Sequence, residues 1–130
     1  MEEYGSLVNL VCANQSQAEL PADLKIGTGA TELMWSDRNP FEVVAIKKNK
    51  KGEVEQLIVR AMDHKPGPNH KGVGCNNWIL TSDVDGKRVV LRFRKGTKKR
   101  AAGWYAKSHD GAWGNRFLVG HAEYYYDWSF

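Results

Sequence analysis

The stretch "FEVVAIKKNKKGEVEQLIVRAMDHK", residues 41–65, decides the fold class of this chain. Val and Ile recur in both of its halves, which is typical of β-strands. Between the halves, the Lys-Asn-Lys-Lys-Gly run has the composition of a tight turn. The stretch therefore predicts two long antiparallel strands joined as a β-hairpin.

Upstream of this hairpin the chain shows one helix signal and one strand signal. Leu7, Val8, Leu10 and Val11 share one helical face, and Ser6 can cap a short helix that ends before Pro21. The segment "DLKIGTGATELMW", residues 23–35, leads from a glycine-rich turn into a strand, which the turn-forming "SDRNP" at 36–40 ends.

Downstream, "PGPNHKGVGCNN" at 66–77 is a loop by its composition. Next, "WILTSDVDGKRVVLRFRKG" at 78–96 predicts a second hairpin that turns at Asp85-Gly86. We expect another strand around Trp104 and Tyr105, a turn at Asp110-Gly111, and one or two strands in residues 116–130.

Six to eight short strands with one short N-terminal helix predict a mainly β fold. We expect a compact antiparallel barrel or strongly bent sheet, SH3-like or similar. The 130 residues, 42% of them hydrophobic, suit a single domain over 1–130. Within it, 1–22 would be the short helix and lead-in, and 23–130 the β domain.

Nothing in the sequence predicts a membrane or a secretory route. No apolar run approaches the roughly 20 residues that span a bilayer, and the acidic start lacks the basic flank of a signal peptide. Cys12 and Cys75 show no paired spacing and read as reduced thiols. We therefore expect a cytoplasmic protein without a membrane partner.

Positive charge is concentrated in two short stretches. "KRVVLRFRKGTKKR", residues 87–100, holds eight Lys or Arg residues and no carboxylate, and "KKNKK" at 47–51 holds four. The remaining positions carry 7 of the 19 basic residues against all 15 acidic ones. This asymmetry favours a phosphate-rich partner that docks in one orientation. The alternative is that both stretches are solvated edges and turns, where lysine prevents strand aggregation.

In a β-strand over 88–94, side chains would alternate between two faces, one apolar and one that carries the arginines. Arginine binds phosphate oxygens bidentately, and a neighbouring aromatic ring can stack on a base. The candidate ligand-binding residues are Arg92, Arg94, Lys98, Lys99, Arg100, Trp104, Tyr105 and Arg38. For Trp104 and Tyr105 a core position is the competing interpretation.

We expect no metal, no cofactor and no catalytic residue. His64 and His70 beside Asp63 lack the short-range ligand spacing of zinc sites. In "HAEYYYDWSF", residues 121–130, the polar side chains of an extended strand would lie about 7 Å apart, too far for direct hydrogen bonds. The aromatic side chains of this segment would face the core or a homo-oligomer interface.

Three stretches carry a resemblance to a known group: "IGTGATELMWSDRNPFEVV" at 26–44, "VRAMDHK" at 59–65 and "AEYYYDWSF" at 122–130. In these the chain resembles small accessory proteins encoded by tailed bacteriophages and prophages. The resemblance implies action in the cytoplasm of an infected bacterium and implies no catalytic residues.

Together, the basic stretch and the resemblance predict a non-enzymatic binding protein that counters bacterial immunity by sequestering a nucleotide signal. Two alternatives stay open. The first is an anti-CRISPR-type inhibitor that binds a host defence protein, and the second is a sequence-tolerant nucleic-acid-binding module.

Overall fold

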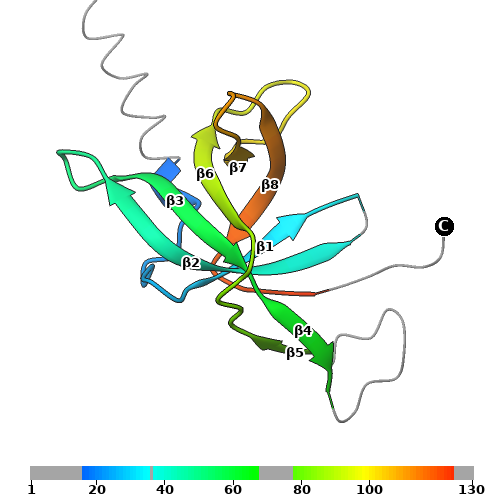
Figure 1. Cartoon of the computed structure of the whole chain (residues 1–130). Coiled ribbons are helices and arrows are strands. Elements are labelled where there is room, and N and C mark those ends of the chain that lie inside the picture. The colour runs from blue at the N-terminus through cyan, green and yellow to red at the C-terminus, as the bar shows by residue number, and fades with distance from the viewer. Residues whose placement is uncertain (1–15, 36, 68–77, 125–130) are drawn as a thin grey trace, which may run out of the picture.

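A six-stranded closed barrel forms the body of the molecule in the computed structural model, which describes residues 16–35, 37–67 and 78–124. The strands are β1 (Gly29–Leu33), β2 (Arg38–Lys48), β3 (Val54–Ala61), β4 (Asp63–Pro66), β5 (Trp78–Thr81), β6 (Arg88–Arg94), β7 (Gly103–Lys107) and β8 (Trp113–Val119). The barrel order is β1-β2-β3-β6-β7-β8, antiparallel throughout, while β4 and β5 pair as a ribbon that projects from it (Figure 1). The predicted mainly β fold with an antiparallel barrel is confirmed.

The hairpin predicted at 41–65 is confirmed as β2 and β3. Its turn is closed by Asn49, whose side-chain oxygen accepts the backbone N–H groups of Lys51 and Glu53 at 2.9 and 3.1 Å. Gly52 adopts a φ of 83°, which residues with a Cβ rarely adopt. Away from the turn, Val43 pairs with Val59, and both side chains are fully buried in the barrel.

Inward-facing side chains of all six barrel strands make the core. The largest fully buried residues are Trp104, Phe117, Leu57, Leu91, Val43 and Val59. On β6, Leu91 lies in the core and Val89 and Phe93 pack against it, as period two predicts. The arginines of β6 consequently point outward.

Residues 16–18 have helical backbone and lie against one end of the barrel. The indole N–H of Trp104 donates to the Ser16 carbonyl at 3.1 Å, and the Gln17 side chain bonds both backbone groups of Val54. The helix expected at 7–11 lies outside the described residues.

The prediction that residues 78–96 form a second hairpin is wrong. β5 pairs with β4, where His64 opposes Leu80, while β6 pairs with β3 and β7. In the barrel, β6 buries its apolar face in the core. The β4–β5 ribbon offers no such burial, because every residue of β4 is exposed. The predicted turn at Asp85-Gly86 is present. It requires glycine at position 86, because a Cβ there would lie 2.2 Å from the Ala61 carbonyl oxygen and clash with it.

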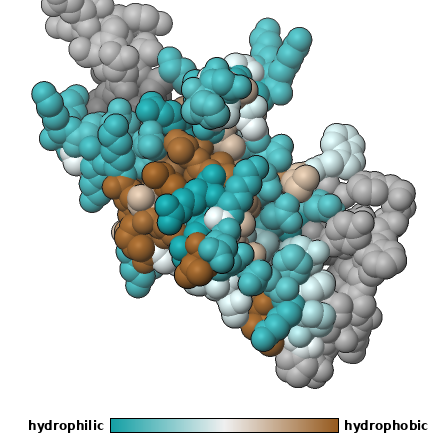
Figure 2. All heavy atoms as spheres, in the orientation of Figure 1, coloured by the Kyte–Doolittle hydropathy of each residue, from teal (hydrophilic) through white to brown (hydrophobic). Residues whose placement is uncertain are grey.

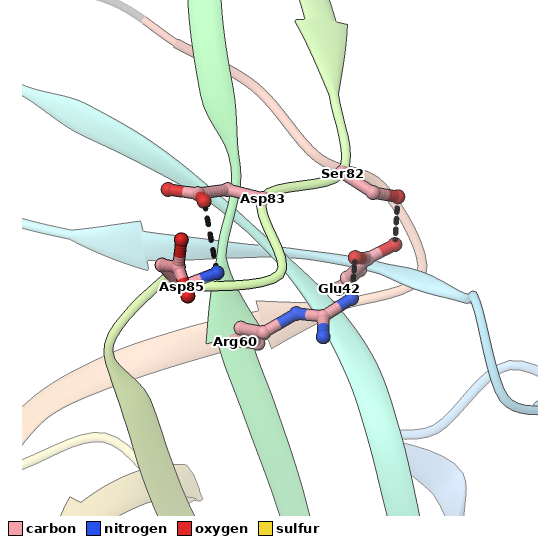
Figure 3. Close-up of polar contacts among 5 residues, drawn as sticks. All are labelled: Glu42, Arg60, Ser82, Asp83 and Asp85. Atoms are coloured by element: carbon pink, nitrogen blue, oxygen red, sulfur yellow. Dashed lines mark hydrogen bonds and ion pairs between the residues drawn. The ribbon is translucent and has the colours of Figure 1, made fainter.

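Hydrogen bonds and one ion pair connect the segment between β5 and β6 to strands β2 and β3 of the barrel (Figure 3). Glu42 accepts hydrogen bonds from Arg60 at 2.8 Å and from the Ser82 hydroxyl at 2.9 Å. Asp83 accepts from the backbone N–H of Asp85 at 3.0 Å and so closes the turn. These contacts direct the chain from the ribbon back into the barrel beside β3.

The alternating strand expected over 121–130 is not formed at 121–124, and 125–130 lie outside the described residues. Instead the Thr31 hydroxyl donates to the His121 carbonyl at 2.7 Å. Tyr124 stacks on His64 with centroids 3.6 Å apart and meets Trp78 edge-on. The segment after β8 thus bridges β1 and the β4–β5 ribbon.

The outer surface of the barrel is not uniformly basic. Ala45, Ile58 and Val90 are neighbours across β2, β3 and β6, and all three are half-buried. Figure 2 shows apolar residues gathered over this part of the barrel with hydrophilic residues around them. The described part of the chain contains no helix long and apolar enough to cross a membrane.

Candidate functional site

Basic and aromatic side chains meet on the outer face of β6, β7 and β8. Strand register explains their meeting, because Arg92 pairs with Tyr105 and Lys107 pairs with Trp113. Directly paired residues point to the same side of a sheet. We call Arg92, Arg94, Tyr105, Lys107 and Trp113 the cationic face.

Two cations share one indole ring within the cationic face. The guanidinium carbon of Arg94 lies 4.5 Å from the ring centroid of Trp113 and 5.3 Å from that of Tyr105. The ammonium nitrogen of Lys107 lies 4.1 Å from the Trp113 centroid. Cation–π attraction holds both charges near the ring although they repel each other. A bound anion would relieve that repulsion.

The cations of this face are not neutralised by carboxylates in the described part of the chain. The ion pairs found there are Arg60–Glu42 and Arg116–Glu19, neither of which belongs to the cationic face. Arg92 donates to the neutral side-chain oxygen of Gln56 at 3.0 Å. The guanidinium is thereby oriented while it keeps its full charge.

A hollow of about 430 Å³ adjoins this face. Arg92, Lys107 and Trp113 line it together with residues from the N-terminal segment, the β2–β3 turn and the start of β3, among them Glu53 and Glu55. Its size lies in the range of small-molecule sites, about 300 to 1,000 Å³. It offers cations, carboxylates and an aromatic ring to one ligand.

Trp104 takes the core position that was the competing interpretation of its place in the sequence. It pairs with Phe93, which places it on the inward face, and it is only 1% exposed. Tyr105 faces outward but is covered by Arg94, and its hydroxyl donates to the Ala101 carbonyl at 2.7 Å. The accessible ring of the face is instead Trp113, which is half-buried.

Trp113 and Lys107 were missed by sequence reasoning, although the sequence held a signal for them. A turn was predicted at Asp110-Gly111, and residues at equal distances on either side of a hairpin turn become partners. The loop proves to have three residues, 109–111, and counting outward from its centre at Asp110 brings Lys107 opposite Trp113, whereas a two-residue turn at Asp110-Gly111 would have brought it opposite Gly114.

The remaining predicted residues hold positions apart from the cationic face. Lys98 and Lys99 are exposed in the β6–β7 loop, and the Arg100 guanidinium donates to the Lys95 carbonyl at 2.8 Å. Arg38 donates to the carbonyls of Met34 and Asp37 and thereby fastens the β1–β2 turn. Lys98 and Lys99 can attract an anion at a distance, whereas Arg38 has a structural role in its own turn.

The β7–β8 turn that presents Trp113 is organised by Asp110. Its carboxylate accepts hydrogen bonds from the Ser108 hydroxyl and the Ala112 backbone N–H. The Ser108 bond is the main cause that lowers the pKa of Asp110 below its ordinary value. These hydrogen bonds therefore stabilise the turn fully at pH values above the ordinary carboxyl pKa. The stabilisation is lost as the pH falls through the lowered pKa of Asp110.

No protein-family model, curated protein or solved structure matched the chain. Within the described ranges, no group of three His, Cys, Asp or Glu side chains could hold a metal ion.

Proposed function

We propose that this protein is a non-enzymatic binding protein that holds a nucleotide on the cationic face. The observation that carries the proposal is the pair of cations on Trp113, which have no carboxylate partner among the described residues and lie beside a hollow of small-molecule size. Arg94 and Lys107 would contact phosphate oxygens through charge-assisted hydrogen bonds. Displacement of Arg94 toward the phosphate would free the indole ring for stacking.

The carboxylates in the hollow favour a mononucleotide-sized ligand over a long strand. Glu53 and Glu55 line the same hollow as Arg92, so positive charge does not continue across it. An extended phosphate backbone needs a continuous basic track. The hydroxyl groups of a nucleotide sugar can instead donate hydrogen bonds to these carboxylates.

This binding would serve to sequester a nucleotide signal of bacterial immunity. The resemblance to phage accessory proteins supports such a role in the cytoplasm of an infected bacterium. Sequestration requires tight binding without turnover, which suits a site made of cations and rings.

A second candidate function is inhibition of a host defence protein, and Trp35 favours it. This side chain is 95% exposed in the β1–β2 turn. Arg38 and the bond from the Met34 N–H to the Asp37 carbonyl fix the turn. Tryptophan is enriched among the residues that dominate protein interfaces.

Thermal unfolding with a panel of cyclic and linear nucleotides and a short single-stranded DNA tests the proposal. A ligand at 100 to 1,000 times its Kd should add about 3 to 4 kcal/mol, which corresponds to roughly 10 °C for this size. We expect a shift with a nucleotide that persists at high salt. A shift with the DNA alone, lost at high salt, would indicate a nucleic-acid-binding module. If no ligand shifts the transition, the nucleotide proposal is wrong.

A further inference from the structure

A second hollow, of about 560 Å³, opens at one end of the barrel. Its lining comes from the last residues of β1 and β7 and the first residues of β6 and β8, so it lies at the barrel mouth opposite the β2–β3 turn. Val89, Ala106 and Trp113 give it apolar walls, and Glu32 lies among them. This combination of apolar walls and a single oriented carboxylate is typical of a small-molecule site.

Two amides hold the Glu32 carboxylate in a fixed orientation. The Asn39 amide donates to one oxygen at 3.1 Å, and the Asn115 amide donates to the other at 3.2 Å. Both neighbours must donate, since an ionised carboxylate can only accept hydrogen bonds. Each oxygen keeps a further lone pair for a ligand.

Glu32 forms no ion pair with the described residues, although Lys87 and Arg88 line the same hollow. A half-buried carboxylate that lacks a cation is costly unless other donors satisfy it. Two neighbouring N–H groups on one ligand edge would satisfy both oxygens at once, in the way that a guanidinium binds a carboxylate.

We propose that the barrel mouth binds a guanine base, whose N1–H and N2–H groups donate to the two oxygens of Glu32. Guanine is the one standard base with two adjacent donors on its pairing edge, because adenine, cytosine and uracil place a donor beside an acceptor. Lys107 and Trp113 line both hollows, so a base in the mouth adjoins phosphates on the cationic face. This inference rests on the proposed nucleotide binding and names the base.

Calorimetric titration with guanosine and adenosine monophosphates, on the wild type and on Glu32→Gln, tests the assignment. We expect the wild type to prefer the guanine nucleotide at least about tenfold, because a site that accepts two hydrogen bonds from a ligand discriminates against a ligand that lacks one of the donors. In Glu32→Gln the amide N–H would face a ligand N–H, so guanine affinity should fall and the preference should disappear, while adenine affinity should not fall, because the amide offers an acceptor and a donor to the adenine edge. Asp23→Asn removes one carboxylate at an exposed site and should leave the preference intact.

A ligand-side measurement needs no variant and covers the case in which Glu32→Gln does not fold. A guanosine monophosphate methylated at N1 lacks one of the two donors and should bind the wild type about tenfold more weakly than the unmethylated ligand. Equal affinities for guanine and adenine, or for methylated and unmethylated ligand, would overturn the guanine assignment but leave nucleotide binding standing. Absence of binding by every nucleotide would instead overturn the proposed function.

Discussion

Replacement of Trp104 by alanine is expected to lower the free energy of unfolding by about 3 to 5 kcal/mol. The side chain is 1% exposed and packs edge-on against Phe93 with centroids 6.0 Å apart. Its loss would leave a cavity in the core and remove the donor to the Ser16 carbonyl. Chemical denaturation followed by circular dichroism measures the change.

The matched control is Trp35→Ala, which removes the same side chain from an exposed turn. Because Trp35 is 95% exposed, its loss should change stability by less than about 0.5 kcal/mol. Comparable losses in the two variants would contradict the assignment of Trp104 to the core.

Reversal of both arginines of the cationic face, in Arg92→Glu/Arg94→Glu, is expected to weaken nucleotide affinity at least about 100-fold. Each arginine offers charge-assisted hydrogen bonds, worth about 1.5 to 3 kcal/mol apiece. The new carboxylates would in addition repel the phosphates. Titration calorimetry of the two proteins against the best nucleotide of the panel gives the ratio.

Lys98→Glu/Lys99→Glu makes the same change in net charge at the exposed β6–β7 loop. We expect only a severalfold loss at low salt, and none at high salt, because screening removes the long-range attraction of exposed charges. Equal losses in the two double variants would show that overall charge, and not the cationic face, determines binding.

The strands of the barrel could be predicted wherever alternation and turn chemistry agreed. β2 and β3 followed from their Val and Ile content and the Asn49 to Gly52 turn. The outward arginines of β6 followed from the position of Leu91 in a period of two. Local pattern sufficed here because one face of each strand is buried.

Pairing partners beyond the β2–β3 hairpin could not be predicted, since they depend on contacts between distant segments. The sequence of β5 does not show that it pairs with β4, nor does the Asp-Gly turn show that β6 continues into the barrel beside β3. The site at the barrel mouth could not be predicted for the same reason, because Glu32, Asn39 and Asn115 come together from three different strands. Adjacent aromatics such as Trp104 and Tyr105 necessarily face opposite sides, but which one faces the core required the register.

The measurement that most directly tests nucleotide binding on the cationic face is a ¹H–¹⁵N correlation spectrum of the labelled protein, recorded with and without saturating nucleotide. The indole N–H signals report the tryptophans individually, and Trp113→Phe identifies the signal of the face. We predict that the Trp113 signal moves on binding while that of the exposed Trp35 does not. An unmoved Trp113 signal at saturation, or movement of Trp35 in its place, would contradict the account.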